Sequence, residues 1–167
     1  MQIGVVKEIK DREHRVALTP EGAGQLVEAG HDVVIEDKAG AEAGFSNVQY
    51  EQQGARIGGR KHAWESELVL KIKEPQETEY RYFSNNILFT YLHLSGVTPN
   101  LTTALLQAGT TAIAYETVED EHGRFPLLAP MSAIAGNMAA SIGNYYLAKF
   151  NGGRGVQMGS VQGQRHG

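Results

Sequence analysis

The sequence predicts an α/β domain with three layers, in which helices cover both faces of a mainly parallel sheet. Two short apolar runs, residues 68–72 and 87–92, are typical of strands buried on both faces. A polar segment, residues 76–85, separates them and is long enough for a short helix. A strand, a helix and a strand in this order make the two strands parallel, with their carboxyl ends at one edge of the sheet.

The same alternation runs along the rest of the chain. Strands are expected at residues 3–6, 32–36, 55–57, 68–72, 87–92 and 110–115. Helices are expected at residues 20–29, 46–54, 61–66, 76–85, 100–108 and 132–150. Thr19 followed by Pro20 marks one helix start, a hydroxyl N-cap before a proline at the first helical position, and Gly30 ends that helix. Residues 125–130 are apolar and expected to be extended. This order is typical of a Rossmann-like or flavodoxin-like fold.

Composition and charge exclude several classes of protein. The chain has 167 residues, is 41% hydrophobic and carries a net charge of −4. That length suits about one domain with a core of its own, and the scattered lysines and arginines form no basic face for nucleic acid. There is no cysteine, which excludes disulfides and thiolate metal sites. With no leader pattern and no run long enough to span a membrane, the expected location is cytoplasmic.

The last part of the chain differs from the rest. The helix expected at residues 132–150 is rich in alanine and glycine, which keeps one side thin. Residues 151–167 are glycine-rich and read as a linker, so the predicted domain is 1–150. The glycines at 152–159 lack the G-x-G-x-x-G spacing and follow no strand, so they are not a dinucleotide fingerprint.

Two chemistry-bearing side chains follow the two central strands. Lys73 comes just after residues 68–72, and His93 comes just after residues 87–92. The carboxyl edge of an open parallel sheet is where such folds bind ligands. A cation and a proton-transfer group there suggest a small anionic substrate that undergoes acid/base chemistry. A solvated strand-end lysine and a histidine bonded to a backbone carbonyl are the alternatives.

Three further residues join this list of candidates. Arg15 lies in the loop after the first strand and is either a surface ion-pair arginine or a two-pronged clamp for a carboxylate. Met131 and Ser132 open the long helix. Ser132 is expected to be its N-cap, and a helix N-terminus with a hydroxyl also suits a polar ligand group. The histidines, at 14, 31, 62, 93, 122 and 166, show no paired spacing, so no metal site is expected.

Seven short segments together resemble the N-terminal half of bacterial alanine dehydrogenase, in the alanine dehydrogenase and pyridine nucleotide transhydrogenase superfamily. They are GVVKEIK (4–10), RVALTP (15–20), LKIKEP (70–75), FTYLHL (89–94), TAIAYET (111–117), LLAPMS (127–132) and GGRG (152–155). They follow the family's order across nearly the whole chain. No single segment is specific, but the set is.

The resemblance implies a substrate, a cofactor and residue roles. The family interconverts L-alanine with pyruvate and ammonium using NAD, commonly as a homohexamer. By motif, Arg15 would bind the substrate carboxylate, Lys73 the carboxylate or carbonyl oxygen, and His93 would be the general acid/base. Tyr91 and Met131 would line the pocket. Ser132 and Ala135 would lie close to the cofactor.

The sequence departs from the family after the GGRG segment. Family members continue into a Rossmann domain with its own glycine fingerprint, whereas this sequence ends at Gly167, and Ser160 and Gln162 replace the usual glycine and proline. A chain of these 167 residues is therefore expected to be inactive alone. Two alternatives remain. One is the nucleotide-binding subunit of a proton-translocating transhydrogenase, which generally lacks a histidine at the place of His93. The other is a non-catalytic binding or oligomerisation module.

Overall fold

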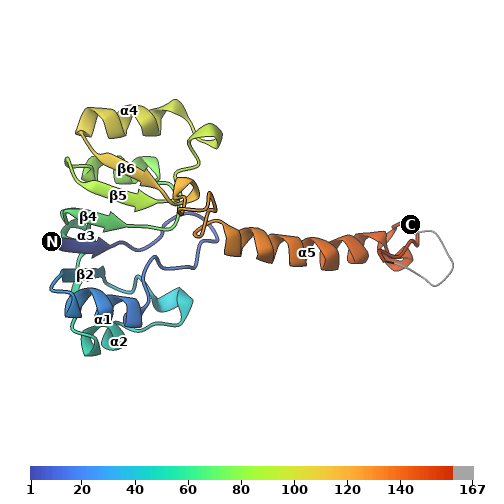
Figure 1. Cartoon of the computed structure of the whole chain (residues 1–167), viewed down its shortest axis with the longest axis horizontal. Coiled ribbons are helices and arrows are strands. Elements are labelled where there is room, and N and C mark those ends of the chain that lie inside the picture. The colour runs from blue at the N-terminus through green and yellow to red at the C-terminus, as the bar shows by residue number, and fades with distance from the viewer. Residues whose placement is uncertain (160–167) are drawn as a thin grey trace. The chain divides into compact units, whose positions relative to one another are not determined.

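The computed structural model describes residues 1–159 and places them in two compact units (Figure 1). The first unit is Met1–Thr117, and the second begins at Val118. Residues 160–167 of the predicted linker, including Ser160, Gln162 and His166, lie outside the described residues. The chemistry predicted for Arg15, Lys73 and His93 therefore falls in the first unit, and that predicted for Met131, Ser132 and Ala135 falls in the second.

The first unit is built on one six-stranded sheet in which every pairing is parallel. Its strands are β1 (Gln2–Val5), β2 (Asp32–Glu36), β3 (Arg56–Gly58), β4 (Leu68–Leu70), β5 (Ile87–Thr90) and β6 (Thr111–Ala114). They lie in the order β3-β2-β1-β4-β5-β6, which can be followed in Figure 1. The α/β fold with a parallel sheet is confirmed.

Helices connect these strands. The α-helices of the first unit are α1 (Pro20–Glu28), α2 (Asn47–Gln52), α3 (Arg60–Trp64) and α4 (Pro99–Ala108). Its 3-10 helices are η1 (Ala41–Ala43), η2 (Glu77–Tyr82), η3 (Leu94–Gly96) and η4 (Tyr115–Thr117). The second unit contains α5 (Ala129–Leu147) and η5 (Lys149–Asn151). No helix within residues 1–159 is long and apolar enough to cross a membrane.

Alternating side chains along the strands build a separate core on each face of the sheet. Ile3, Val33, Ile35 and Leu70 pack with Ala23 of α1 and Tyr50 of α2 in one cluster. Val34, Val69 and Leu88 pack with Trp64 of α3, Phe83 and Leu101 of α4 in the other. Because successive strand residues point to opposite faces, one strand feeds both clusters. These are the two helical layers that the sequence predicts.

The strand order reverses between β1 and β4. From β1 the chain proceeds to β2 and then β3 on one side, and it returns to build β4, β5 and β6 on the other. The loops that leave the carboxyl ends of β1 and β4 therefore diverge. Open parallel sheets bind ligands at such a reversal. This reversal positions the candidate site.

The short helix expected within residues 76–85 is present as the 3-10 helix η2. Three other local expectations were wrong. Residues 125–130 are not extended, because the amides of Leu128 and Ala129 both donate to the carbonyl of Phe125 in a turn. The long helix begins at Ala129 and not at Ser132, with Leu128 as its N-cap and Pro130 in its first turn. Ser132 is thus not a cap, and its hydroxyl donates to the carbonyl of Leu128 at 3.3 Å.

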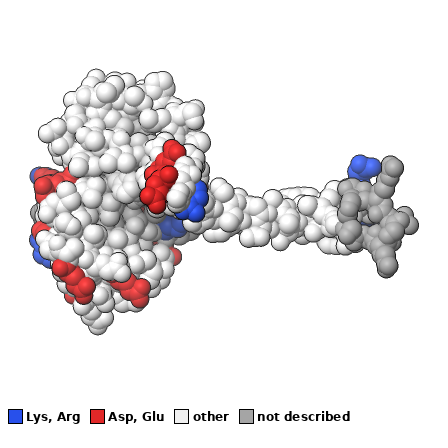
Figure 2. Space-filling view, viewed as in Figure 1, with Lys and Arg blue, Asp and Glu red and all other residues white. Residues whose placement is uncertain are grey.

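The helix α5 is unusual in composition. It carries no lysine, arginine, aspartate or glutamate between Ala129 and Leu147, and Figure 2 shows it as uncharged surface. None of its residues is buried. Ile134, Met138, Ile142 and Tyr145 are among its exposed apolar side chains. Soluble monomers rarely expose a continuous apolar surface of this kind.

Candidate active site at the carboxyl edge of the sheet

Arg15, Lys73 and His93 follow the carboxyl ends of three adjacent strands. Arg15 lies in the connection from β1 to α1, Lys73 follows β4, and His93 follows β5. Since β1, β4 and β5 are neighbours in a parallel sheet, all three loops leave the same edge. This arrangement is the one expected from the strand-ending pattern in the sequence.

The peptide groups on both sides of Lys73 are fixed. Its amide lies 3.4 Å from Oε1 of Glu8, which also accepts the amide of Ile72 at 2.6 Å. Its carbonyl accepts a hydrogen bond from the buried hydroxyl of Thr90 at 3.0 Å. The side chain itself is half-buried. The base of the lysine is therefore anchored, while its long stem keeps the freedom to reach a ligand.

His93 is held in a backbone conformation that few residues adopt. Its φ of 48° and ψ of 42° lie in the left-handed region, where a residue other than glycine is uncommon. The carboxylate of Glu116 accepts the amides of His93 at 2.6 Å and of Leu92 at 3.3 Å. Glu116 belongs to η4, which follows the neighbouring strand β6. This contact compensates for the local strain and leaves the imidazole exposed at the sheet edge.

Arg15 is paired with Glu13 in a two-pronged contact. Its Nε donates to Oε1 at 2.8 Å and its Nη2 donates to Oε2 at 2.7 Å. This hydrogen bonding lowers the pKa of Glu13 and raises that of Arg15, and the charge of Lys73 lowers the pKa of Glu13 further. Glu13 thus orients the guanidinium and is close enough to Lys73 for the charge of that lysine to act on it.

Tyr91, two residues before His93, packs against the segment that follows β6. Its ring packs edge-on against Tyr115 at a centroid distance of 4.9 Å, and Tyr115 packs likewise against Phe89 at 4.2 Å. Burial raises the pKa of the Tyr91 phenol, the charge of Arg15 opposes that rise, and the charge of Glu116 adds to it. The charges of Arg15 and of Glu116, which holds the backbone of His93, therefore both act on the phenol of Tyr91.

The remaining candidates lie on α5 in the second unit. Met131 is partly buried, and Ser132 and Ala135 are exposed. All three are in the first two turns of the helix. They are brought together on one element, and the roles predicted for them remain predictions.

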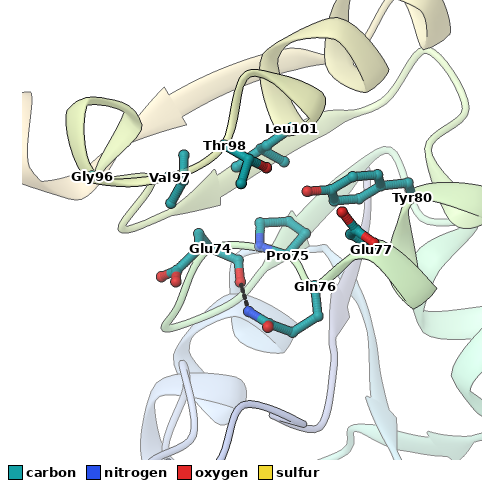
Figure 3. Close-up of a pocket in the computed structure, with 9 residues that line it drawn as sticks. All are labelled: Glu74, Pro75, Gln76, Glu77, Tyr80, Gly96, Val97, Thr98 and Leu101. Atoms are coloured by element: carbon teal, nitrogen blue, oxygen red, sulfur yellow. Dashed lines mark hydrogen bonds between the residues drawn. The ribbon is translucent and has the colours of Figure 1, made fainter.

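A cavity of about 260 Å³ adjoins the ends of β4 and β5 (Figure 3). Its lining residues are Glu74, Pro75, Gln76, Glu77, Tyr80, Gly96, Val97, Thr98 and Leu101. The phenol of Tyr80 points into the space between Pro75 and Thr98. Arg15, Lys73 and His93 are not among its lining residues, although Glu74 directly follows Lys73. The cavity thus lies beside the candidate site without containing its predicted chemistry.

Three carboxylates that organise the site were missed by sequence reasoning. Glu8 holds the backbone at Lys73, Glu13 holds Arg15, and Glu116 holds the backbone at His93. Glu8 and Glu116 lie within two of the seven family-like segments, next to strand ends, so a signal was available. The partners of Glu8 and Glu116 are peptide groups and a side chain distant in sequence, which no local pattern reveals.

The first unit thus brings two cations, a phenol and an imidazole to one edge of the sheet. A guanidinium recognises a carboxylate, and an ammonium polarises a carbonyl oxygen. An imidazole takes up or releases a proton near neutral pH. Together they suit a small acid that carries a carbonyl or amino group next to its carboxylate.

Comparison with known proteins identifies the relatives of this chain. The alanine dehydrogenase from Geobacillus stearothermophilus is 48% identical over 170 residues, covering 100% of this chain and 45% of that protein. The alanine dehydrogenase from Bacillus subtilis (strain 168) is 51% identical over 170 residues, covering 100% of this chain and 44% of its own length. The chain thus spans under half the length of these relatives.

Two solved structures are also similar to this chain. An L-alanine dehydrogenase structure superposes with a TM-score of 0.84 at 48% identity, over 100% of this chain and 46% of that chain. A transhydrogenase from Sinorhizobium meliloti superposes with a TM-score of 0.66 at 28% identity, over 70% of this chain and 34% of that chain. The family model described as "Alanine dehydrogenase/PNT, N-terminal domain" matches residues 4–135. This chain therefore belongs to the alanine dehydrogenase/PNT N-terminal domain family.

Proposed function

We propose that this chain is the substrate-binding domain of an NAD-dependent L-alanine dehydrogenase, which interconverts L-alanine with pyruvate and ammonium. The observation that carries the proposal is the placement of Arg15, Lys73 and His93 after three adjacent parallel strands, in a chain matched over its full length by proteins named alanine dehydrogenase. The transhydrogenase reading is weaker, since that relative is 28% identical over 70% of the chain.

Each residue has a distinct part in binding. Arg15, already oriented by Glu13, binds the carboxylate of alanine or pyruvate. Lys73 donates to the carbonyl oxygen of pyruvate and stabilises negative charge that develops there. Tyr91 lines the substrate pocket, and a substrate contact for Met131 remains a prediction of the family resemblance. Binding energy from the carboxylate fixes the position of Cα relative to the imidazole.

His93 is proposed as the general acid/base. Conversion of alanine to pyruvate and ammonium needs protons moved between the amino nitrogen, the attacking water and solvent. An exposed imidazole on a fixed backbone suits that transfer, because histidine is the side chain most often used as a general acid/base.

The described residues do not fit NAD by themselves. The connection from β1 to α1, residues 6–19, contains no glycine, and the glycines from 152 follow the 3-10 helix η5 instead of a strand. A dinucleotide site needs a glycine-rich turn between a strand and a helix. Roles for Ser132 and Ala135 near the cofactor therefore remain proposals, as does the assignment of 1–150 to the substrate domain and 151–167 to a linker toward an NAD-binding domain.

The proposal also includes a cytoplasmic location and a homo-oligomeric state. A cysteine-free sequence fits the reducing cytoplasm. The exposed apolar side chains of α5, which carries no charged residue, support a homo-oligomer.

Calorimetric titration of the 167-residue chain with pyruvate tests the substrate assignment. Acetate, which has the carboxylate but no ketone, is the matched ligand. We expect pyruvate to bind at about millimolar Kd and acetate to bind more weakly. Arg15→Lys should weaken binding because a lysine cannot make the two-pronged contact. Equal affinity for both ligands, or no effect of Arg15→Lys, would contradict the proposed roles.

A further inference from the structure

Three charged side chains are buried together at the reversal of strand order. Lys71 is 0% exposed, and Glu79 and Glu8 are 1% and 8% exposed. Nζ of Lys71 donates to Oε2 of Glu8 at 2.6 Å and lies 3.4 Å from Oε1 of Glu79. Glu8 follows β1 and Lys71 follows β4, the two strands between which the order reverses. The pair thus bridges two loops that otherwise diverge.

This cluster is separate from the groups assigned to the substrate. Lys71 has no exposed surface, so its ammonium reaches no ligand in solvent. Burying three charged groups is costly, and an apolar set of the same volume commonly stabilises a fold equally well or better. Stability alone is therefore a poor reason for placing a lysine and two glutamates here.

The geometry connects the cluster to Lys73. One oxygen of Glu8 faces Lys71, and the other accepts the amide of Ile72 at 2.6 Å and lies 3.4 Å from the amide of Lys73. Thr90 holds the Lys73 carbonyl from the neighbouring strand at 3.0 Å. The backbone from which the Lys73 side chain emerges is thus fixed on both sides by buried groups.

Lys71 aims the carboxylate of Glu8. A carboxylate can accept several hydrogen bonds. Its orientation is fixed only when each of its two oxygens has a partner. Lys71 engages one oxygen, which leaves the other facing the peptide amides after β4. Glu79 completes the cluster by accepting the amide of Gln76 at 2.8 Å, which attaches the start of η2 to the same ammonium.

We propose that Glu8 is a positioning residue for Lys73, with Lys71 as the buried cation that orients it. Glu8 touches no substrate atom in this proposal. It sets where the Lys73 ammonium lies at the sheet edge, so it affects substrate binding through the backbone. The consequence for the substrate rests on the proposed function, whereas the consequence for the backbone at Ile72 and Lys73 does not.

The test uses the 167-residue chain with Glu8→Gln and the double variant Glu8→Gln/Lys71→Met. The single change leaves one acceptor oxygen, which the ammonium of Lys71 attracts, so the NH2 group faces the amides of Ile72 and Lys73 and cannot accept from them. The double change removes that ammonium and keeps an acceptor for the amide of Ile72. Glu36→Gln is the matched control. Glu36 is also buried, also binds a cation, Arg60, and also accepts a backbone amide, that of Lys7.

Two measurements separate positioning from general destabilisation. Amide NMR spectra report the hydrogen bonds of Ile72 and Lys73, and a pyruvate titration reports the Lys73 ammonium. We expect Glu8→Gln to move both amide resonances upfield and to weaken pyruvate binding roughly tenfold, since losing a hydrogen bond to a charged group costs about that factor. The double variant should restore the Ile72 resonance and part of the affinity. Glu36→Gln should change neither.

Unchanged Ile72 and Lys73 amides in Glu8→Gln would overturn the proposal. So would equal losses of affinity in Glu8→Gln and Glu36→Gln, because a shared loss would be a stability effect. If the unmodified chain binds no pyruvate, the proposed function fails, and the amide resonances alone decide whether Glu8 positions the backbone.

Discussion

His93 shows how far the position of a candidate catalytic residue depends on its neighbours. The left-handed backbone and the hydrogen bond from its amide to Glu116 hold the main chain of His93, and the imidazole lies against Gly96, which has no Cβ. The sequence identified His93 as the residue that ends a strand run. Neither the strained backbone nor Glu116 was predicted, because both arise from packing between β5 and the segment after β6.

Gly96→Ala should displace the imidazole without unfolding the chain. A Cβ added at Gly96 would lie 2.5 Å from Nε2 and from Cδ2 of His93. The ring is the end of a side chain and can rotate away at little cost to stability. We expect the thermal midpoint to change little while the imidazole carbon resonances of His93 shift clearly. Gly59→Ala, where an added Cβ meets nothing within 4 Å, is the control. Unshifted His93 resonances would show that the ring lies elsewhere.

Glu79 should make stability depend on pH. Burial raises its pKa above the usual value of about 4.5, and the charge of Lys71 opposes that rise. In the window from about 4.5 up to the raised pKa the folded state binds more protons than the unfolded state, so the free energy of unfolding falls as pH rises.

Urea unfolding from pH 4 to pH 8 checks this contribution. Glu79→Gln removes the titrating group, so the stability of the variant relative to the unmodified chain should increase with pH, by at most about 1.4 kcal/mol per pH unit within the window. Glu77→Gln is the control, because Glu77 is close in sequence but exposed. A stability difference that stays constant with pH would mean that Glu79 is not the titrating group.

At the scale of elements, the contact between α3 and β1 depends on one glycine. A Cβ at Gly4 would lie 1.8 Å from the carbonyl oxygen of Ala63, so the helix can approach the strand only where no side chain intervenes. Gly4→Ala should lower the free energy of unfolding by about 3 kcal/mol. Gly59→Ala in the same helix–strand region should change it by less than about 1 kcal/mol. Similar losses in both variants, measured by urea unfolding, would contradict this packing.

Most strands and helices could be predicted from local patterns. Apolar runs locate the strands, and the Thr19-Pro20 start of α1 is confirmed, with the Thr19 hydroxyl accepting the amide of Gly22 at 3.2 Å. The helix α5 starts earlier than expected because Pro130 belongs to its first turn instead of preceding it. Proline is also tolerated in a first helical turn, where its missing N–H has no partner to lose. With the turn at Phe125, the N-cap is Leu128, four residues before Ser132.

At the scale of the whole chain, we expect the apolar face of α5 to mediate self-association. Ile134, Met138, Ile142 and Tyr145 are 59%, 54%, 46% and 56% exposed. Their spacing of four, four and three residues places them on one face. We expect sedimentation velocity to show an assembly larger than a monomer. Met138→Lys should shift it toward monomer, while Ala140→Lys, on the opposite face, should not. A monomer at all concentrations in the unmodified chain would contradict self-association.

We expect the loops after β1, β4 and β5 to form one site for a small 2-oxo or 2-amino acid. A pyruvate titration of the 15N-labelled 167-residue chain, followed residue by residue, tests this expectation. The perturbed amides should cluster around Arg15, Lys73 and His93 and saturate with a single Kd. Perturbations confined to the opposite edge of the sheet, or to the cavity lined by Tyr80 and Thr98 without those three residues, would contradict it.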